Sequence, residues 1–311
     1  MKDQTPTLDT SFADMPRTKW LSAVASVAEE DGFFQTLGPN HFAAFAEDTS
    51  TLLVTFETMQ GIHALSDLAQ PLGWEMLKAH HWSHLCVGSD GDTWFRDEAV
   101  YAFFDRLVDD GFFDEFDTVI FYGAGPCAYA AAAFSVTAPG AHVVAIQPQA
   151  TLDPRMTEWD PRFMPMRAAD FTSRYGYAPD MLDAAASAHV LYDPREQLDA
   201  MHAALFTRSN VTKHRMRFMG DALQTDLLEM NEWANLLLAV ADEGLTPLTF
   251  ARLYRTRRDH YTYLRGLLSV LEAEGRDRLA ASLCRNVTTR MNAPKFTKRL
   301  AEIEARLAEH A

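Results

Sequence analysis

The chain has 311 residues, of which 48% are hydrophobic and 23% are charged, and its formal net charge is −15. This composition is typical of one large or two modest globular domains, and no apolar run is long enough to span a membrane. The acidic balance excludes general nucleic-acid binding by the body of the chain. The three cysteines, Cys86, Cys127 and Cys284, lie far apart, without disulfide or metal-binding spacing. We therefore predict a cytoplasmic protein without a metal site.

The first part of the chain predicts helices followed by strands that alternate with helices. Residues 1–20 have no clear periodicity, and residues 57–73 are predicted to be a polar loop. The expected helices are Trp20–Ala28, Phe42–Ala46, Trp74–His80 and Asp97–Asp109, and the expected strands are Leu52–Phe56 and His84–Gly88.

The stretch from Asp117 to Ala133, DTVIFYGAGPCAYAAAA, predicts a buried strand, a sharp glycine turn and a helix. The apolar run Val119–Tyr122 is typical of a parallel strand buried on both faces. Pro126 suits the first helical turn, and the alanines that follow are strong helix formers. This shape serves two chemistries, a dinucleotide-phosphate cradle and a nucleophile elbow.

Beyond this stretch, strand–helix alternation continues to about residue 220 and then only helices are expected. The further strands are His142–Ile146, His189–Tyr192 and His214–Met219, and residues 147–179 form a long loop. Alternation of this kind predicts an α/β fold with a mainly parallel sheet. We divide the chain into an α/β domain at residues 1–221, in which residues 1–50 are a helical lead-in, and a helical C-terminal subdomain at residues 222–311.

The charge is distributed unevenly, because residues 251–311 contain 13 lysine and arginine residues against 7 acidic ones. The segment Arg252–Leu268 places Arg255, Arg258 and Arg265 near tyrosines. Such a basic region either binds an anionic partner or docks on the acidic body, and an amphipathic, solvated helix pair is the simpler interpretation. The sequence leaves self-association into a homo-oligomer open.

Gly123, Gly125 and Ala128 give one interpretation of the turn, as a variant of the G-x-G-x-x-G/A fingerprint for FAD or NAD(P). The following strand, however, ends in Gln147, where a ribose-binding carboxylate is expected. The motif also follows two predicted strands instead of opening the fold. The alternative interpretation of the turn is a nucleophile elbow, and on that interpretation no cofactor is expected.

That second interpretation involves more of the chain, because FYGAGPCAYAA resembles the FYGSSMGGYAAL elbow of α/β-hydrolase-fold proteins linked to polysaccharide biosynthesis and accessory secretion. TLLVTFE, Trp94-Phe95-Arg96, HVVAIQPQATLDP and AHVLYDP resemble further segments of that group. The resemblance spans about residues 50–220. It implies an α/β-hydrolase sheet with a helical C-terminal cap and makes Asp193 the candidate acid of a catalytic triad.

The same resemblance implies that the nucleophile and the base are missing. Gly125 occupies the position of the serine, and Gly220-Asp221 stands where the group has Gly-His. Acyl transfer needs a nucleophile bonded to a base that an acid orients. One hypothesis is a binding or accessory protein, and the alternative is a thiol enzyme with Cys127 as nucleophile, His63 as base and Asp193 as the orienting acid. In that alternative the helix N-terminus would lower the pKa of the Cys127 thiol.

Alternating charges follow the long loop at residues 147–179 and include Arg155, Arg162 and Arg167. They either line a pocket for an anionic ligand over the carboxyl ends of the strands or form a surface lid joined by salt bridges. Together with the aromatic residues of the loop, they make a small-molecule or glycan-like ligand the expected partner.

Overall fold

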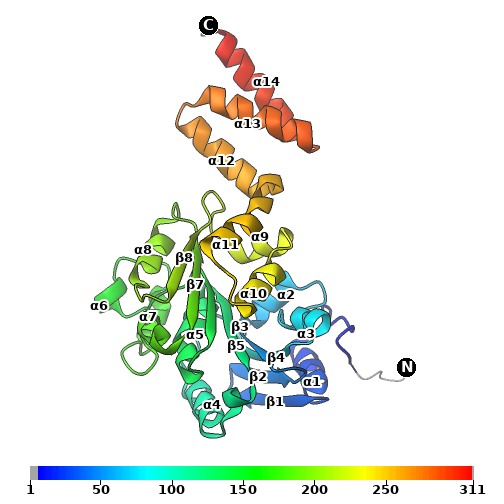
Figure 1. The fold of residues 1–311 in the computed structure, drawn as a ribbon, viewed down its shortest axis with the longest axis vertical. Helices are drawn as coiled ribbons and strands as arrows, with labels where there is room; N and C mark the ends of the chain where they lie inside the picture. The colour runs from blue at the N-terminus through cyan, green and yellow to red at the C-terminus, as the bar shows by residue number, and fades with distance from the viewer. Residues whose placement is uncertain (1–5, 310–311) are drawn as a thin grey trace.

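The computed structural model describes residues 6–309 and contains an eight-stranded sheet with helices on both faces (Figure 1). The strand order is β1-β2-β4-β3-β5-β6-β7-β8. The strands are β1 (Gly32–Leu37), β2 (His41–Ala46), β3 (Thr51–Thr58), β4 (Ser83–Ser89), β5 (Thr118–Ala124), β6 (His142–Ile146), β7 (Ser187–Tyr192) and β8 (Val211–Arg215). The six strands β3 to β8 pair in parallel, and β1 and β2 add an antiparallel edge. The predicted α/β fold with a mainly parallel sheet is confirmed.

The antiparallel edge corrects the prediction of a helix at Phe42–Ala46. These residues form β2, which pairs with β1 on one side and β4 on the other. The three alanines favoured a helix, but every residue of β2 is buried, and a strand covered on both faces reads as a continuous apolar run. Gly38, with φ +67°, opens the connection between β1 and β2, a conformation that suits glycine.

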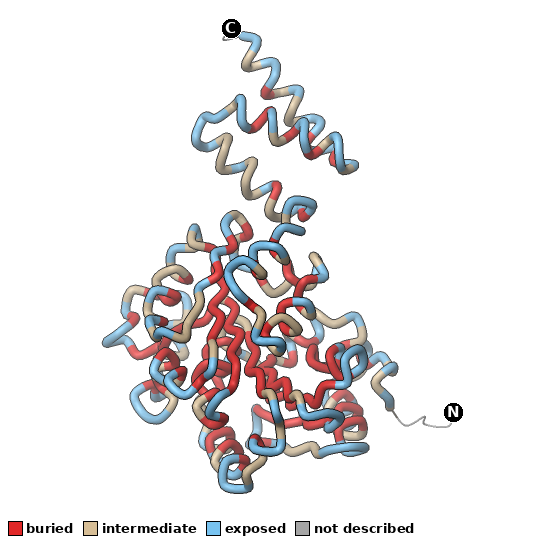
Figure 2. Tube along the Cα trace, in the orientation of Figure 1, coloured by how far each residue is buried: buried red, intermediate tan, exposed pale blue. Residues whose placement is uncertain are grey.

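The helices are distributed over the two faces of the sheet. The α-helices of the body are α1 (Arg17–Ala28), α2 (Met59–Leu65), α3 (Trp74–His80), α4 (Glu98–Asp109), α5 (Pro126–Phe134), α6 (Pro154–Thr157), α7 (Ala178–Met181), α8 (Gln197–Leu205), α9 (Leu223–Glu229), α10 (Trp233–Ala241) and α11 (Pro247–Leu253). Helices α4 and α5 pack on the face that carries Leu52 and Val54, and α9, α10 and α11 pack on the face that carries Leu53. Figure 2 shows the buried residues concentrated in the sheet between these layers.

The last three helices leave the body as a separate arm. They are α12 (Tyr261–Ala273), α13 (Asp277–Arg290) and α14 (Pro294–Glu309), and they project away from the sheet (Figure 1). They enclose a small core of their own, which includes Leu264, Cys284 and Phe296. The helical character expected for residues 222–311 is confirmed. Only α9 to α11 cover the sheet, because the apolar stripes of α12 to α14 are satisfied by one another.

Three further local predictions differ from the structure. The last strand is Val211–Arg215 and not His214–Met219, the residues 57–73 include the helix α2, and the long loop contains short helices. Among residues 6–309, no helix is both long and apolar enough to cross a membrane.

Candidate functional site

The turn between β5 and α5 places Gly125 at its tip. Gly125 has φ 58° and ψ −124°, a conformation that strains any residue with a side chain. Its N–H donates to the carbonyl of Ile146 at 2.8 Å, which ties the turn to the end of β6. A Cβ added at Gly125 would have no heavy atom within 4 Å. A side chain at this position would therefore project freely from the turn.

Gly123, two residues earlier, has a different role. A Cβ at this position would lie 2.2 Å from the carbonyl oxygen of Cys127. Strand β5 and the first turn of α5 are therefore too close together for a residue other than glycine at position 123. The first glycine of the motif permits this close packing, and the second permits the turn.

Cys127 lies in the first turn of α5 and is 6% exposed. Burial raises the pKa of its thiol, and the nearby charges of Glu57 and Asp92 raise it further, although a backbone hydrogen bond from Thr58 opposes them. The expectation of a lowered pKa is wrong, because burial and the two carboxylates raise the pKa of this thiol. The thiol therefore remains protonated at neutral pH.

A cavity of about 190 Å³ lies beside the turn and is lined by 11 residues from β3, β5, α2, α5 and α9 and from the loop after β4. Its polar lining residues are Glu57, Thr58, Asp92 and Gln224. Gly125 itself is not among the lining residues, but its neighbours Ala124 and Pro126 are.

Glu57 is a buried carboxylate that the sequence analysis did not single out. It accepts hydrogen bonds from the Thr55 hydroxyl at 2.6 Å and from the backbone N–H of Leu72 at 3.0 Å. Burial nevertheless raises the pKa of its carboxyl group. The only signal in the sequence was a single Glu near the end of the apolar strand segment LLVTFET. A charged group buried in such a strand needs hydrogen-bond partners.

Asp193 follows β7 at the carboxyl edge of the sheet and is 1% exposed. Its Oδ2 atom accepts the backbone N–H groups of Met219, at 2.8 Å, and of Gly220, at 2.9 Å. Its Oδ1 atom accepts the N–H of Arg195 at 2.9 Å. The loop after β8 therefore presents backbone amides to Asp193, and Asp221 is the exposed residue that follows them.

His63 lies on α2, is exposed, and packs its ring against Trp20, with the ring centroids 5.6 Å apart. It does not line the cavity beside Cys127, and neither does any other described histidine. The structure brings Gly123, Gly125 and Cys127 together at the turn, whereas Asp193 belongs to the β8 loop. This placement gives no support to a relay between His63 and Cys127.

The arginines of the long loop are engaged within the protein. Arg155 pairs with Asp153 at 2.6 Å, and Arg162 pairs with Asp160 at 2.8 Å and Asp199 at 2.6 Å. Arg167 donates to three carbonyl groups of residues 157–160. Of the two interpretations of this loop, the contacts favour a lid joined by salt bridges over a pocket for an anion.

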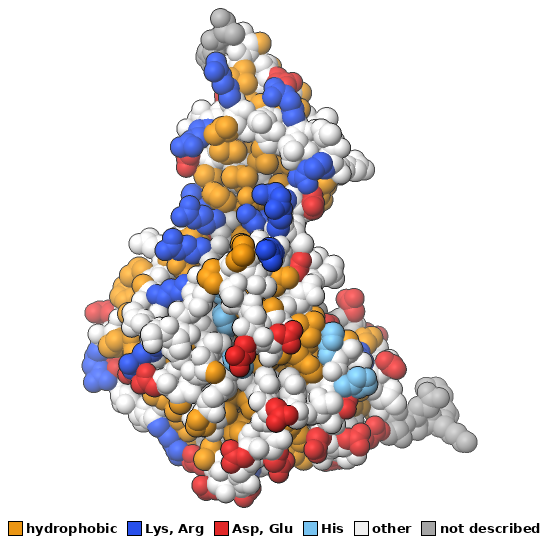
Figure 3. Space-filling model, viewed as in Figure 1, with side chains coloured by type: hydrophobic (Ala, Val, Ile, Leu, Met, Phe, Trp, Pro, Cys, Tyr) orange, Lys and Arg blue, Asp and Glu red, His pale blue; other side chains and the backbone are white. Residues whose placement is uncertain are grey.

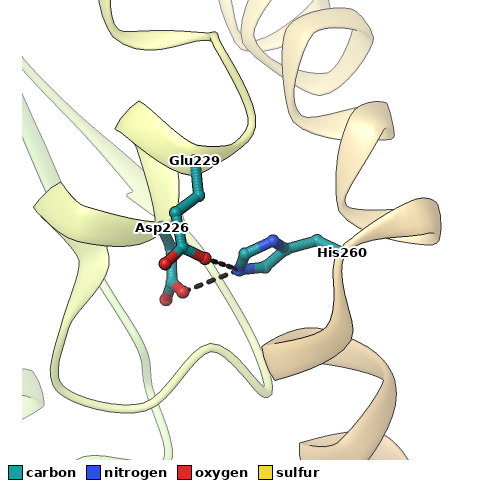
Figure 4. A group of neighbouring side chains, drawn as sticks. All are labelled: Asp226, Glu229 and His260. Carbon is teal, nitrogen blue, oxygen red and sulfur yellow. Dashed lines mark hydrogen bonds and ion pairs between the residues drawn. The ribbon is translucent and has the colours of Figure 1, made fainter.

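One group of side chains has the composition of a metal site. Asp226 and Glu229 of α9 face His260, which precedes α12, and their ligand atoms lie within 4.8 Å of one another (Figure 4). His260 Nε2 is 2.7 Å from Asp226 Oδ1 and 3.8 Å from Glu229 Oε2. The geometry is that of a His–Asp ion pair with an exposed Glu beside it, which joins the arm to the body.

Comparison with known proteins finds similarity only at the level of the fold. No protein-family model matches the sequence, and a search of the curated proteins finds no relative. Among solved structures, the glycosylation-associated Gap123 complex of Streptococcus agalactiae has a chain similar to 66% of this one, with 13% identity and a TM-score of 0.44. The match covers 45% of that chain, so this protein corresponds to less than half of its length.

Two other solved structures are similar to part of the chain. An esterase of Pyrobaculum calidifontis covers 77% of this chain and matches over 97% of its own, with 14% identity and a TM-score of 0.42. The capsule O-acetyltransferase of Neisseria meningitidis serogroup A covers 65% of this chain and matches over 91% of its own, with 10% identity and a TM-score of 0.40. At identities of 10–14%, these similarities concern the fold alone.

Proposed function

We propose that this α/β-hydrolase-like protein binds a small polar ligand at the turn between β5 and α5 and does not cleave esters. The observation that carries this proposal is the glycine at position 125, at the tip of the turn. An acyl-transfer enzyme needs a nucleophilic side chain at that point. Gly125 has none.

The surroundings of Asp193 support the same proposal. In a triad the acid accepts a hydrogen bond from the imidazole of the base and orients it. Here the Oδ2 atom of Asp193 accepts two backbone N–H groups from the loop after β8. The carboxylate then fixes a loop and does not orient a base.

The cavity beside the turn indicates the class of ligand. Its volume of about 190 Å³ is below the roughly 300–1,000 Å³ of pockets that enclose drug-sized molecules. The side chains of Thr58, Asp92 and Gln224 in its lining can accept hydrogen bonds from hydroxyl groups, and the Glu57 carboxylate, already bonded to Thr55 and Leu72, lies beside them. A hydroxyl-rich group such as one unit of a glycan fits this set of acceptors better than an anion does.

The thiol enzyme is the alternative, and the environment of Cys127 disfavours it. A catalytic cysteine acts as a thiolate and is normally found next to a positive charge. Cys127 is buried, and the charges nearest to it that affect its pKa are the carboxylates of Glu57 and Asp92. The FAD or NAD(P) alternative is disfavoured because the Gln147 side chain, at the expected ribose position, is hydrogen-bonded to Asp199 and to the backbone of Leu223.

The first experiment offers activated short-chain esters to the wild type and to Cys127→Ala. We expect no turnover by either protein, because losing the nucleophile and base of such an enzyme costs on the order of a million-fold in rate. Turnover that disappears in Cys127→Ala would establish the thiol enzyme.

The second experiment measures binding of mono- and disaccharides by ligand-observed NMR. Gln224→Leu removes a polar group from the cavity wall and should weaken the binding. Gln197→Leu, an exposed position on α8 outside the cavity, is the matched control. Equal binding by both variants would show that the sugar lies elsewhere, and no binding of any sugar would reject the proposed ligand class.

A further inference from the structure

A second cavity lies at the exposed edge of the sheet, where β8 meets α11 and the start of the arm. Its volume is about 430 Å³, and it shares no lining residue with the cavity beside Gly125. The basic residues in its lining are Lys213, Arg215, Arg217 and Arg257, together with His214. Its described lining contains no aspartate or glutamate.

These four cations have no described carboxylate partner, although Lys213 Nζ donates to the backbone carbonyl of Ala204 at 3.4 Å. No described carboxylate lies within 4.0 Å of Lys213, Arg215, Arg217 or Arg257, whereas the arginines at 155, 162, 174, 208 and 299 all form ion pairs. The chain has 43 acidic residues against 28 basic ones, so unpaired cations around one cavity are not explained by a shortage of carboxylates. Figure 3 shows Lys and Arg side chains gathered around the narrow junction between the body and the arm.

Aromatic rings form the other part of the wall. Phe250 and Tyr254 of this cavity stack with their centroids 5.6 Å apart. The guanidinium of Arg257 lies 4.2 Å from the centroid of Tyr254 and 5.3 Å from that of Tyr263, and it donates to the Tyr254 carbonyl at 2.7 Å. Arg257 is therefore held in place between two rings before any ligand arrives.

The position of β8 at the sheet edge explains only part of this arrangement. Lysine and other charged side chains on an edge strand prevent it from pairing with another chain, and that accounts for Lys213 and Arg215. It does not account for Arg217, which follows the strand, or for Arg257 and the tyrosines, which come from the helical region. Four cations that repel one another at one cavity are stabilised by an anion placed among them.

We propose that this cavity binds a phosphorylated small molecule that carries a flat ring, of the size of a nucleotide. The cations would hold the phosphate groups, since arginine is suited to bidentate contacts with phosphate. Tyr254 is buried between Phe250 and Arg257, so the half-buried ring of Tyr263 would offer the stacking surface to the ligand's ring. The volume of about 430 Å³ lies within the roughly 300–1,000 Å³ found for small-molecule sites.

The test uses calorimetry on the full chain with ADP, pyrophosphate and adenosine as separate ligands, and a single-stranded oligonucleotide as a further probe. We expect saturable binding of ADP that is stronger than the binding of pyrophosphate or adenosine, and that weakens as salt is raised. Binding of the oligonucleotide without binding of ADP would overturn the proposal in favour of a nucleic-acid surface. No binding of ADP, or binding of pyrophosphate as strong as that of ADP, would also overturn it.

Variants locate the site. Arg217→Glu and Arg257→Lys should each weaken ADP binding by about tenfold or more, the first because it reverses a charge at the phosphates and the second because lysine lacks the planar, bidentate guanidinium. Arg257→Lys keeps the charge and removes the stacking of the guanidinium. Arg217→Glu changes an exposed side chain, so we expect this variant to fold. Arg278→Ala, an exposed arginine on α13 outside this cavity, is the matched control. Equal loss in the control variant would reject the proposed site, and this test is independent of any ligand at Gly125.

Discussion

The carboxylate of Asp193 accepts the backbone N–H of Gly220 at 2.9 Å, and this contact connects the end of β7 to the loop after β8. The same oxygen accepts the N–H of Met219 at 2.8 Å. The sequence resemblance assigns to Asp193 the role of a catalytic acid and to the Gly220-Asp221 region the base that it would orient. In the structure the two regions are joined by hydrogen bonds, but the donors are backbone N–H groups and not an imidazole. The contact thus holds the two loops next to each other without the participation of an imidazole.

Asp193→Ala should therefore change stability. The substitution leaves three buried or half-buried backbone N–H groups without their acceptor, and we expect the free energy of unfolding to fall by about 3 kcal/mol. Asp193→Asn should cost less, because its amide oxygen still accepts. Urea denaturation of the three proteins measures the difference. A change below about 0.5 kcal/mol, the range of ordinary surface substitutions, would show that the carboxylate does not anchor the loop.

Rebuilding the missing groups tests why the turn is inactive. A serine at position 125 has open space around its Cβ, and a histidine at position 221 would follow the loop that Asp193 holds. We expect Gly125→Ser and Asp221→His to be inactive singly, and the double variant to release product from an activated ester in at least a single burst. Equal activity in the Gly125→Ser variant alone would mean that another base is already present.

The strand–turn–helix around Gly125 could be predicted from the sequence because each of its signals is local. The apolar run, Pro126 and the alanines define strand and helix, and β6 was predicted with the bounds that the structure shows. The strand β2 was missed because an all-buried Phe–Ala run has no alternation, and only pairing with β1 and β4 decides its conformation. Tertiary contacts overrode the helix propensity of alanine.

The candidate site was harder to predict than the fold. Gly125 and Asp193 were found through the resemblance, but Glu57, Gln224 and Arg257 were not singled out, because they meet only after chain segments far apart in sequence come together. The pKa of Cys127 was predicted in the wrong direction, since the sequence shows the helix N-terminus and does not show the burial that outweighs it. Asp226 and His260, at 2.7 Å, are 34 residues apart and gave no signal.

The two glycines of the turn should respond differently to substitution by alanine. At Gly123 the new Cβ would lie 2.2 Å from the carbonyl of Cys127, and this clash with backbone requires α5 to move. At Gly125 the new Cβ meets nothing, and only the positive φ carries a cost, of about 1–3 kcal/mol. Thermal unfolding should therefore show a much larger loss for Gly123→Ala than for Gly125→Ala. The opposite order would mean that the turn has another geometry.

Acidification should destabilise the protein through histidines that are buried in neutral form. Burial lowers the pKa of His84 and of His214 to about 3 and that of His189 to about 4. The unfolded chain binds protons at these residues below about pH 6.5, whereas the folded chain does not until the pH nears these lower values. Their contribution to stability is therefore complete above about pH 6.5 and is lost progressively as the pH falls below it.

Urea denaturation between pH 7.5 and 4.5 measures the slope of the free energy of unfolding against pH. His214→Phe keeps a ring against Phe250, whose centroid lies 4.2 Å from that of His214, and removes one titrating group. It should make the slope shallower, whatever its effect on stability at pH 7.5. An unchanged slope in this variant would exclude His214 as one of the responsible groups.

The joint between the body and the arm includes a buried His–Asp pair and should loosen when that pair is removed. His260 pairs with the buried Asp226 (Figure 4), and Tyr263 packs its ring against Phe218 with the centroids 6.2 Å apart. His260→Ala leaves the Asp226 carboxylate buried and unpaired, a change that is strongly destabilising in other proteins. Because α12 to α14 have their own core, we expect the joint to loosen while the arm stays helical.

Hydrogen exchange with peptide resolution tests this expectation. Amides of α9 and of the first turn of α12 should exchange faster in His260→Ala, by about tenfold or more for each 1.4 kcal/mol lost locally, while those of β5 should keep their protection. Glu229→Gln is the control, since the side chain of Glu229 is 60% exposed and its distance to His260 Nε2 is 3.8 Å. It should change exchange at the joint little. Faster exchange throughout the sheet in His260→Ala would instead show that the ion pair stabilises the whole body of the protein and that the arm has no separate joint.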